Sequence, residues 1–449
     1  MIKNDLTKGN IFHNLIRFSV PYLVSCFLQT FYGLADLFIT GQFYGADTIT
    51  AVSVGSQVMH MVTIIIVGFA MGTTVTVSYA MGAKDKRSAG KAIGNSLFLF
   101  AAIAIALTAT MFFGMDGILR LLSVPKEALT ETKDYLTVCT AGILFIVAYN
   151  VLSSIFRGLG DTRTPMYFVA VAGVINIGLD ILFLGPLSMG AFGAALATVI
   201  AQALSVAAAL IYTAKRVPEL RLTKCDLLPS GKCLSELLKI GLPVAAQDGL
   251  IQIAFLVITV IANRRGVDAA AAVGIVEKII SFLFLVPSAM LSSVSTITSA
   301  SIGGGMPERG QKTLTYAMVL CIGSGLIFTV ICTAFAENIL TLFAGNSPAV
   351  ILFGSQYLRA YVIDCMIAGI HFCFSGYFCA YRKSWFAFVH NIASASLIRI
   401  PGSMLAATLY PATLFPMGLA APLGSLFSVI ICVIAYFILF RKKNRTAVC

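Results

Sequence analysis

Three polar residues, two of them acidic, stand inside long apolar stretches of this 449-residue chain. Asp36 lies in one stretch, and Asn176 and Asp180 lie four positions apart in another, so the latter two share a helical face. An ionised aspartate at the centre of a membrane helix costs about 2.5 to 3.5 kcal/mol unless it faces protein, water or a partner. Two carboxylates in a low-dielectric site suit Na⁺ or a proton. We interpret Asp36, Asn176 and Asp180 as a cation site.

Two neutral side chains could add oxygen ligands to this site. Asn150 and Thr198 lie in neighbouring apolar stretches at compatible depths. The structural alternative is that each aspartate caps a broken helix or hydrogen-bonds a serine or threonine across helices. An acidic pair with an asparagine four residues away favours the cation site over that alternative.

The composition places these residues in a membrane protein. Hydrophobic residues make up 58% of the chain, charged residues 11%, and the mean hydropathy is +0.92, which excludes a soluble domain. A bilayer span needs about 20 apolar residues, and twelve such stretches recur. They lie near 12–40, 50–80, 90–114, 135–157, 164–185, 190–214, 236–262, 270–300, 312–335, 353–380, 385–410 and 414–440.

The second half of the chain repeats the first at an offset of about 222 residues. The matched positions include Pro21 with Pro243, Gly82 with Gly303, Lys91 with Lys312, Tyr135 with Tyr357, and Lys215-Arg216 with Arg441-Lys442. Six spans per half is an even number, so the repeat is parallel. Asp36 falls opposite Ile258 and Asp180 opposite Gly402, so the acidic site exists in one half only.

The predicted fold is therefore an all-α integral membrane protein, with twelve transmembrane helices in two parallel-repeat six-helix bundles around a central cavity. We expect an N-terminal lobe at 1–217 with the cation site, a cytoplasmic linker at 218–235 that is rich in proline and charge, and a C-terminal lobe at 236–449.

The formal net charge is +12. We attribute this charge to basic residues in cytoplasmic loops, as the positive-inside rule requires, and not to a nucleic-acid partner. Basic residues gather after the second and fourth spans, in the linker and at the C-terminus, whereas Arg264-Arg265 breaks the rule. We expect a multi-pass protein of the bacterial inner (plasma) membrane with both termini cytoplasmic. The eleven cysteines lie mostly within apolar runs and read as small core residues.

At this point the sequence resembles the multidrug and toxin extrusion (MATE) transporters, in their prokaryotic branch with an N-lobe cation site. The residues that carry the resemblance are the Pro21 helix with Gly33-Leu34-Ala35-Asp36 and Gly41, the loop from Arg157 to Pro165 (RGLGDTRTP), and Asn176 with Asp180. The family's cation ligands match Asp36, Asn150, Asn176, Asp180 and Thr198, of which Asn150 is the weakest match.

The resemblance implies a secondary antiporter that exports amphipathic, often cationic drugs or toxins in exchange for Na⁺ or H⁺. Proline inside a helix supplies a hinge, and Pro21 occupies that place here. Phe31, Tyr32, Tyr149 and Phe282 are candidates for a substrate cavity that holds organic cations on aromatic faces, although most such rings pack in cores or against lipid. We expect no cofactor beyond the coupling ion, and a monomer.

Three alternatives remain open. A lipid-precursor flippase of the same superfamily would carry extra spans and a strongly cationic cavity. A channel fits the single-lobe ion site less well. An intramembrane aspartyl protease is a remote alternative, because Gly158-Leu159-Gly160-Asp161 spells its GxGD string, but Asp161 falls in a predicted loop, and so we expect no enzyme.

The second half carries charges of its own inside the spans. Asp364 and Arg399 lie at similar depths in consecutive antiparallel helices, so they are predicted to form a buried ion pair that stabilises the C-terminal lobe and takes no part in cation coupling. The alternatives are that Arg399 faces the cavity, or that Asp248 is its partner. The sequence assigns no role to Asp248, Glu277 or Lys278.

Overall fold

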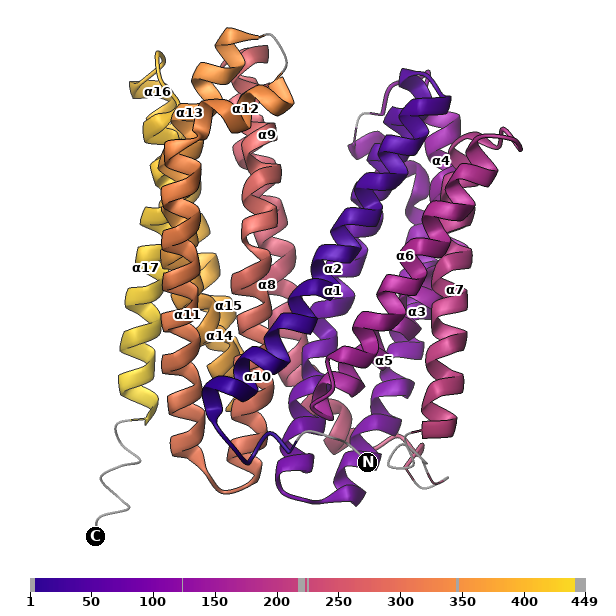
Figure 1. The fold of residues 1–449 in the computed structure, drawn as a ribbon, viewed down its shortest axis with the longest axis vertical. Helices are drawn as coiled ribbons and strands as arrows, with labels where there is room; N and C mark the ends of the chain where they lie inside the picture. Colours follow the sequence, from indigo (N-terminus) through magenta and orange to yellow (C-terminus); the bar gives the residue numbers. More distant parts are fainter. Residues whose placement is uncertain (1–4, 123, 217–222, 224–225, 345–346, 441–449) are drawn as a thin grey trace. The chain divides into compact units, whose positions relative to one another are not determined.

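A computed structural model describes residues 5–122, 124–216, 223, 226–344 and 347–440 of the chain, and these residues form helices without any β-strand (Figure 1). The basic tail from Arg441 onward and most of the segment 217–225 lie outside the described residues. The predicted all-α class is confirmed.

Seven helices build the described part of the first half, and two of them form a single bent span. Helices α4 and α5 meet at an angle of 49°, which leaves six spans as the sequence predicts. The helices are α1 (Ile11–Phe43), α2 (Ala46–Gly82), α3 (Lys86–Leu121), α4 (Leu129–Ala141), α5 (Ile143–Gly158), α6 (Arg163–Leu184) and α7 (Gly190–Arg216).

The second half repeats this arrangement, including the bent fourth span, where α13 and α14 meet at 42°. Counting each bent pair once gives twelve candidate spans in the described residues, which confirms the predicted number. The elements are α8 (Gly231–Asn263), α9 (Val267–Leu283), α10 (Leu285–Gly303), α11 (Pro307–Ala334), α12 (Ala336–Ala344), α13 (Pro348–Tyr361), α14 (Asp364–Ala380), α15 (Trp385–Ser394), the π-helical turn η2 (Ala395–Arg399), α16 (Ile400–Leu409) and α17 (Phe415–Phe440).

The chain divides into two compact units whose bounds differ from the predicted lobes. As far as it is described, unit 1 consists of Met1–Lys8 with Val20–Ala245, and unit 2 of Gly9–Ser19 with Ala246–Cys449. The start of α1 thus belongs to unit 2, and the start of α8 belongs to unit 1. Each change of unit falls beside a proline inside the helix, Pro21 in α1 and Pro243 in α8, where the backbone lacks a hydrogen-bond donor.

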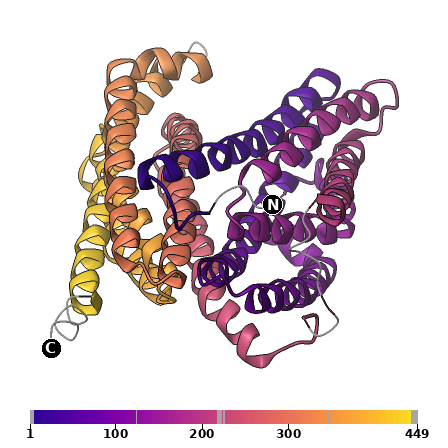
Figure 2. The ribbon, with the colours of Figure 1, turned by 60° about the horizontal axis from the view of Figure 1, so that its bottom comes forward.

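The start of α1 is anchored on α11 within unit 2 (Figure 2). Arg309 Nη1 donates to the carbonyl of Gly9 at 2.8 Å, and the ring of Phe12 meets that of Tyr316 edge to face at 6.1 Å between centroids. These contacts account for the assignment of residues 9–19 to unit 2, because they fix the first turns of α1 to a helix of the second half.

The segment before α8 is anchored in the equivalent way on α3 within unit 1. Buried Asn95 accepts the backbone N–H of Ser230 at 2.7 Å and donates to the carbonyl of Leu228 at 3.4 Å. Asp226 packs so closely on α3 that a Cβ at Gly94 would collide with its carbonyl oxygen. The described part of the linker is therefore a docked segment.

The Asp226 side chain fixes the turn that enters this docked segment. Its carboxylate accepts the hydroxyl and the backbone N–H of Thr223 at 2.6 and 2.9 Å. These hydrogen bonds, and after them the positive charges of Lys91 and Arg87, hold the pKa of the Asp226 carboxyl below its usual value. Asp226 therefore stays ionised at neutral pH.

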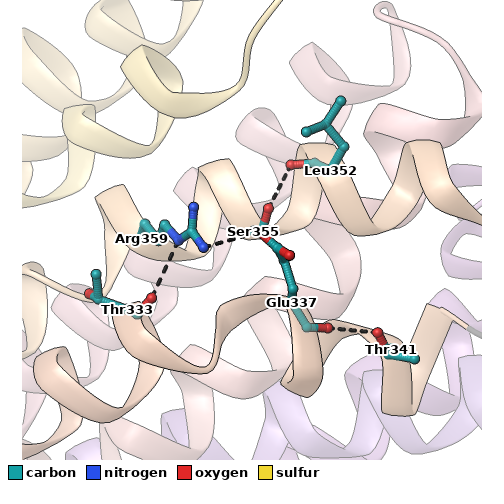
Figure 3. A network of polar contacts seen from close by, with 6 residues as sticks. All are labelled: Thr333, Glu337, Thr341, Leu352, Ser355 and Arg359. Carbon is teal, nitrogen blue, oxygen red and sulfur yellow. Dashed lines mark hydrogen bonds and ion pairs between the residues drawn. The ribbon is translucent and has the colours of Figure 1, made fainter.

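At the far end of unit 2, polar contacts join the ends of α11, α12 and α13 (Figure 3). Arg359 pairs with Glu337 at 3.1 Å and donates to the carbonyl of Thr333 at 3.3 Å. Because the Arg359 and Glu337 side chains are 39% and 65% exposed, this pair adds little stability.

Arg265, one of the two arginines that depart from the positive-inside pattern, is held by backbone carbonyls. Arg265 Nη2 donates to the carbonyls of Tyr410, Pro411 and Thr413 at 2.9, 2.7 and 3.1 Å. Arg265 therefore joins the loop before α9 to the loop before α17 through these carbonyl acceptors.

We predict that Gly94→Ala lowers the thermal stability of the purified protein in detergent. The new methyl group must displace the Asp226 backbone, and overpacking of this kind costs roughly 1 to 3 kcal/mol. The matched control is Gly117→Ala on the same helix, where a Cβ meets nothing within 4 Å, and which should be neutral or stabilising by up to about 1 kcal/mol. Equal unfolding temperatures for the two variants would show that the linker does not dock on α3.

Candidate cation site and buried charges

Four of the five predicted cation ligands converge inside unit 1. Asp36 comes from α1, Asn176 and Asp180 from α6, and Thr198 from α7. Asp36, Asn176 and Asp180 are 4%, 2% and 0% exposed. The spacing of four on α6 places Asn176 and Asp180 on one face, as the sequence predicts.

Thr198 links the helices at the centre of this group. Its hydroxyl lies 3.4 Å from Asp36 Oδ2 and 3.2 Å from the carbonyl of Ala194, and it accepts Asn176 Nδ2–H at 3.4 Å. A hydroxyl has a single proton to donate, and both side-chain contacts are long. Both side-chain contacts are therefore weak, and the single hydroxyl proton serves two possible acceptors.

Four buried oxygens in this group accept no hydrogen bond within the described residues: Asp36 Oδ1, Asn176 Oδ1 and both carboxylate oxygens of Asp180. Buried acceptors without donors are costly, and the two carboxyl groups also interact with one another, so two negative charges would repel. Carboxylate, amide and hydroxyl oxygens are hard ligands. The group therefore fits a small hard cation or a proton.

Asn150 is not joined to these four residues. It is buried on α5, and its Nδ2 donates to the carbonyl of Ile146 at 2.8 Å, one turn back in its own helix. The structure shows no hydrogen bond between Asn150 and Asp36, Asn176, Asp180 or Thr198 among the residues it describes. Its role as a ligand stays a prediction.

Tyr32 and Gln202 form a second polar contact between α1 and α7, the helices that carry Asp36 and Thr198. The sequence prediction of the cation site did not include this contact. Gln202 Nε2 donates to the hydroxyl of Tyr32 at 3.2 Å, one turn from the contact between Thr198 and Asp36. Gln202 Oε1 is a further buried oxygen without a hydrogen-bond donor. Tyr32 lies four residues from Asp36, and Gln202 lies four residues from Thr198, so each pair shares one face of its helix. This spacing is the signal from which the contact could have been predicted.

The candidate substrate aromatics lie in different environments. Phe31 is 51% exposed and stacks on Phe27 with centroids 6.3 Å apart. Tyr149 is buried in a core cluster with Leu152 and Val169, against which Tyr32 packs. Phe282 is half-buried on α9 of unit 2. Their contact with substrate stays a prediction.

Pro21 lies within α1 beside the change of unit. Ser25 Oγ donates to its carbonyl at 3.0 Å, and the guanidinium of Arg157 lies over the ring of Tyr22 at 5.0 Å. Arg157 is only 7% exposed, so this cation–π contact is shielded from water. The missing N–H of Pro21 weakens α1, while Tyr22 fixes the turn after it.

The GxGD string forms a helix cap. Asp161 Oδ1 accepts the backbone N–H groups of Arg163 and Thr164 at 3.0 and 3.1 Å, and Oδ2 accepts the Thr164 hydroxyl at 2.6 Å. An aspartate in this arrangement satisfies the free N–H groups at the start of α6. The string is a turn in this chain, as expected.

Unit 2 brings Asp364 and Arg399 together. Arg399 Nη2 lies 3.5 Å from Asp364 Oδ2 and donates to the hydroxyl of Tyr361 at 2.8 Å. Asp364 is fully buried, and the Arg399 side chain is 14% exposed. Asp248 instead accepts Nε2–H of its neighbour Gln247 at 3.3 Å and forms no ion pair with Arg399 within the described part of the chain.

Two features of the backbone make room for Arg399. It is the last residue of the π-helical turn η2, and such turns interrupt α-helices at strained or functional positions. A Cβ at Gly424 of α17 would collide with Arg399 Cγ, so only glycine allows the side chain to pass. Glu277 lies near enough to Arg399 to interact with its charge and accepts the Thr259 hydroxyl at 3.2 Å.

The sequence model of the MatE family matches residues 21–182 and again residues 243–405. The second match begins at Pro243, where the internal repeat places the counterpart of Pro21, which confirms the duplication. The chain is 28% identical over 437 residues to the probable multidrug resistance protein YpnP of Bacillus subtilis (strain 168), covering 97% of this chain and 96% of that protein.

Solved structures share the fold. A MOP superfamily transporter from Pyrococcus furiosus superposes with a TM-score of 0.90 at 23% identity and covers 96% of each chain. A multidrug resistance MATE family transporter in an outward-facing conformation superposes with a TM-score of 0.91 at 22% identity and covers 98% of each chain.

We predict that Asp364→Asn and Arg399→Gln each reduce the yield of folded protein, because each leaves the other charge buried without a partner, at a cost of about 3 to 5 kcal/mol. The double variant should recover yield, measured by size-exclusion chromatography in detergent. The exposed pair supplies the control, since Arg359→Gln should change stability by less than about 1 kcal/mol. A double variant no better than the worse single variant would show that the two residues do not stabilise one another.

Proposed function

We propose that this chain, which belongs to the MATE family of multidrug and toxin extrusion transporters, is a secondary antiporter. It exports amphipathic, often cationic drugs or toxins across the bacterial inner membrane in exchange for Na⁺ or H⁺. The observation that carries this proposal is the group of four buried oxygens without donors on Asp36, Asn176 and Asp180.

The coupling follows from the electrostatics of that group. With both carboxylates ionised, desolvation and mutual repulsion make the site unstable, and a cation or a proton entering from outside relieves both. Movement of one positive charge inward gains about 2.3 kcal/mol per 100 mV of membrane potential. That free energy is large enough to drive accumulation of a substrate on the other side.

Bending of α1 would convert ion binding into export. Asp36 lies beyond Pro21 in unit 1, whereas residues 9–19 of the same helix belong to unit 2. A cation that draws Asp36 toward Asp180 and Thr198 pulls on this helix, and the missing hydrogen bond at Pro21 allows it to bend. Both termini are cytoplasmic in this scheme, and the monomer is the transporting unit.

The substrate class follows from the family and from aromatic residues. The relative YpnP is named a probable multidrug resistance protein, and half-exposed Phe31, with Phe27 stacked on it, offers an apolar aromatic surface. Rings of this kind hold the flat bodies and positive charges of amphipathic compounds. We therefore expect broad rather than narrow selectivity.

We predict that Asp36→Asn and Asp180→Asn each abolish efflux driven by an imposed Na⁺ or pH gradient in proteoliposomes. Each variant removes one of the charges that binds the cation, while removal of a buried charge also lowers an insertion cost, so folded protein should remain in the membrane. The matched control is Asp47→Asn, an exposed acid in the first turn of α2, which should transport normally. Full coupled transport by either site variant would refute the proposed coupling site.

We predict that Thr198→Val weakens Na⁺-driven efflux more than H⁺-driven efflux. Na⁺ requires several oxygen ligands, whereas a proton binds a carboxylate without help from a hydroxyl. The measurement compares initial efflux rates in the same proteoliposomes under each gradient separately. Equal losses under the two gradients would favour a purely protonic mechanism.

A further inference from the structure

Lys278 presents a positive charge inside a membrane span of unit 2. It lies on α9, within the continuous candidate span Val267–Gly303, about 16 Å along the helix axis from Val267 at 1.5 Å per residue. Its side chain is exposed, and no ion pair of its ammonium group occurs within the residues that the structure describes. Such a charge is costly in lipid unless it meets water or an anion.

The carboxylate next to it in sequence does not neutralise Lys278. Glu277 Oε2 accepts the hydroxyl of Thr259 on α8 at 3.2 Å, and Glu277 Oε1 is buried. Successive residues of a helix point about 100° apart. Glu277 therefore faces the interior of unit 2, and Lys278 faces outward.

The surface around Lys278 differs from the exposed surface of α11 in the same unit. Ala271, Gly274 and Ser281 lie seven and four positions before it and three positions after it, on the same helical face, and Ala271 and Ser281 are exposed. By contrast, the exposed surface of α11 carries large aliphatic side chains, with Val319, Ile327 and Val330 at 58 to 61% exposure. Ile275, three positions before Lys278, packs partly against the core of unit 2, so the exposed neighbours are small or polar, which favours contact of the ammonium group with water over contact with lipid.

The same face continues to an aromatic ring. Phe282 is four residues beyond Lys278 and half-buried, so ring and ammonium group lie one turn apart on α9. An apolar ring beside a single charge matches an amphipathic molecule that carries an acidic group. The ammonium group supplies a charge-assisted hydrogen bond, which strengthens where the surrounding dielectric is low.

We propose that the α9 face of residues 271, 274, 278, 281 and 282 contacts transported substrates, and that Lys278 binds their carboxylate group. The substrates then include amphipathic compounds that carry an acid, among them zwitterions, in addition to purely cationic ones. This inference rests on the proposed transport function, whose ion site lies on unit 1, and it assigns the recognition of an acidic group to unit 2.

The first test asks whether the α9 face meets water. Ser281→Cys is treated in proteoliposomes with a membrane-impermeant, negatively charged methanethiosulfonate, and peptide mass spectrometry separates the new thiol from the native cysteines. The matched control is Ile327→Cys on the exposed aliphatic surface of α11. We expect labelling of the first and none of the second. Absence of labelling at position 281, or equal labelling of both, overturns the proposal.

The second test uses two dyes that differ in one group: rhodamine 110, with a free carboxylate, and rhodamine 123, its methyl ester. Binding to purified protein is measured by fluorescence anisotropy. We expect the wild type to bind the free acid more tightly than the ester, and Lys278→Met to weaken binding of the acid roughly tenfold while leaving the ester unchanged. Lys278→Arg should keep the preference, and the exposed control Lys383→Met should not alter it.

The outcomes separate this inference from the antiport mechanism, because binding needs no gradient. A Lys278→Met protein that keeps the preference for the acid, or that loses affinity for both dyes equally, overturns the role of Lys278. So does a wild type that binds the acid no more tightly than the ester, or that binds neither dye. If the preference depends on Lys278 but neither gradient drives efflux, the Lys278 site stands and the antiport proposal fails.

Discussion

The free-energy cost of charge in a membrane interior is the constraint from which the arrangement of this protein follows. Each ionisable residue inside a span must have a partner, a bound ion or water, and the chain uses all three solutions. Asp364 has Arg399 as its partner. Asp36 Oδ1 and both carboxylate oxygens of Asp180 accept no hydrogen bond within the described residues, which suits the mobile cation that we propose for this group. Lys278 is exposed among small side chains. One physical cost thus accounts for the buried pair and for the coupling site and the recognition site that we propose.

The duplication of the chain explains how its two halves could come to hold different buried charges. Both halves follow the same sequence model and repeat the bent fourth span, so the backbone does not depend on where the charges lie. The first half places its carboxylates where the second has Ile258 and Gly402. The second half instead holds a fixed guanidinium beside Asp364, which a π-helical turn and Gly424 accommodate. A permanent positive charge needs no exchange with solution, so in the mechanism that we propose the response to the ion belongs to the first half.

The sequence predicts the spans, the repeat and the shared face of Asn176 and Asp180, because hydropathy and a spacing of four residues are read along the chain. The meeting of Asp36 with these residues and Thr198 was expected from the cost of buried charge and from the resemblance. It does not predict features that depend on distant backbones. The docking of Asp226 against Gly94 and the exchange of the starts of α1 and α8 between units require the packed structure. Asn150 was included for its compatible depth and its match to the resemblance, and its amide Nδ2 donates to its own helix. Depth along a helix was predictable, but the direction of a side chain around it was not.

Helix α1 is where the separate sites can influence one another. Its start is held on α11 by Arg309 and Tyr316 in unit 2, and Asp36 near its other end takes part in the cation group of unit 1. Because the chain is continuous, a force that acts on Asp36 is transmitted along α1 and is absorbed where the helix is weakest, which is Pro21. Helix α8 has the same construction with Pro243 but without an acid at the counterpart of Asp36. In the mechanism that we propose, this asymmetry of charge makes α1 the helix that responds to the ion.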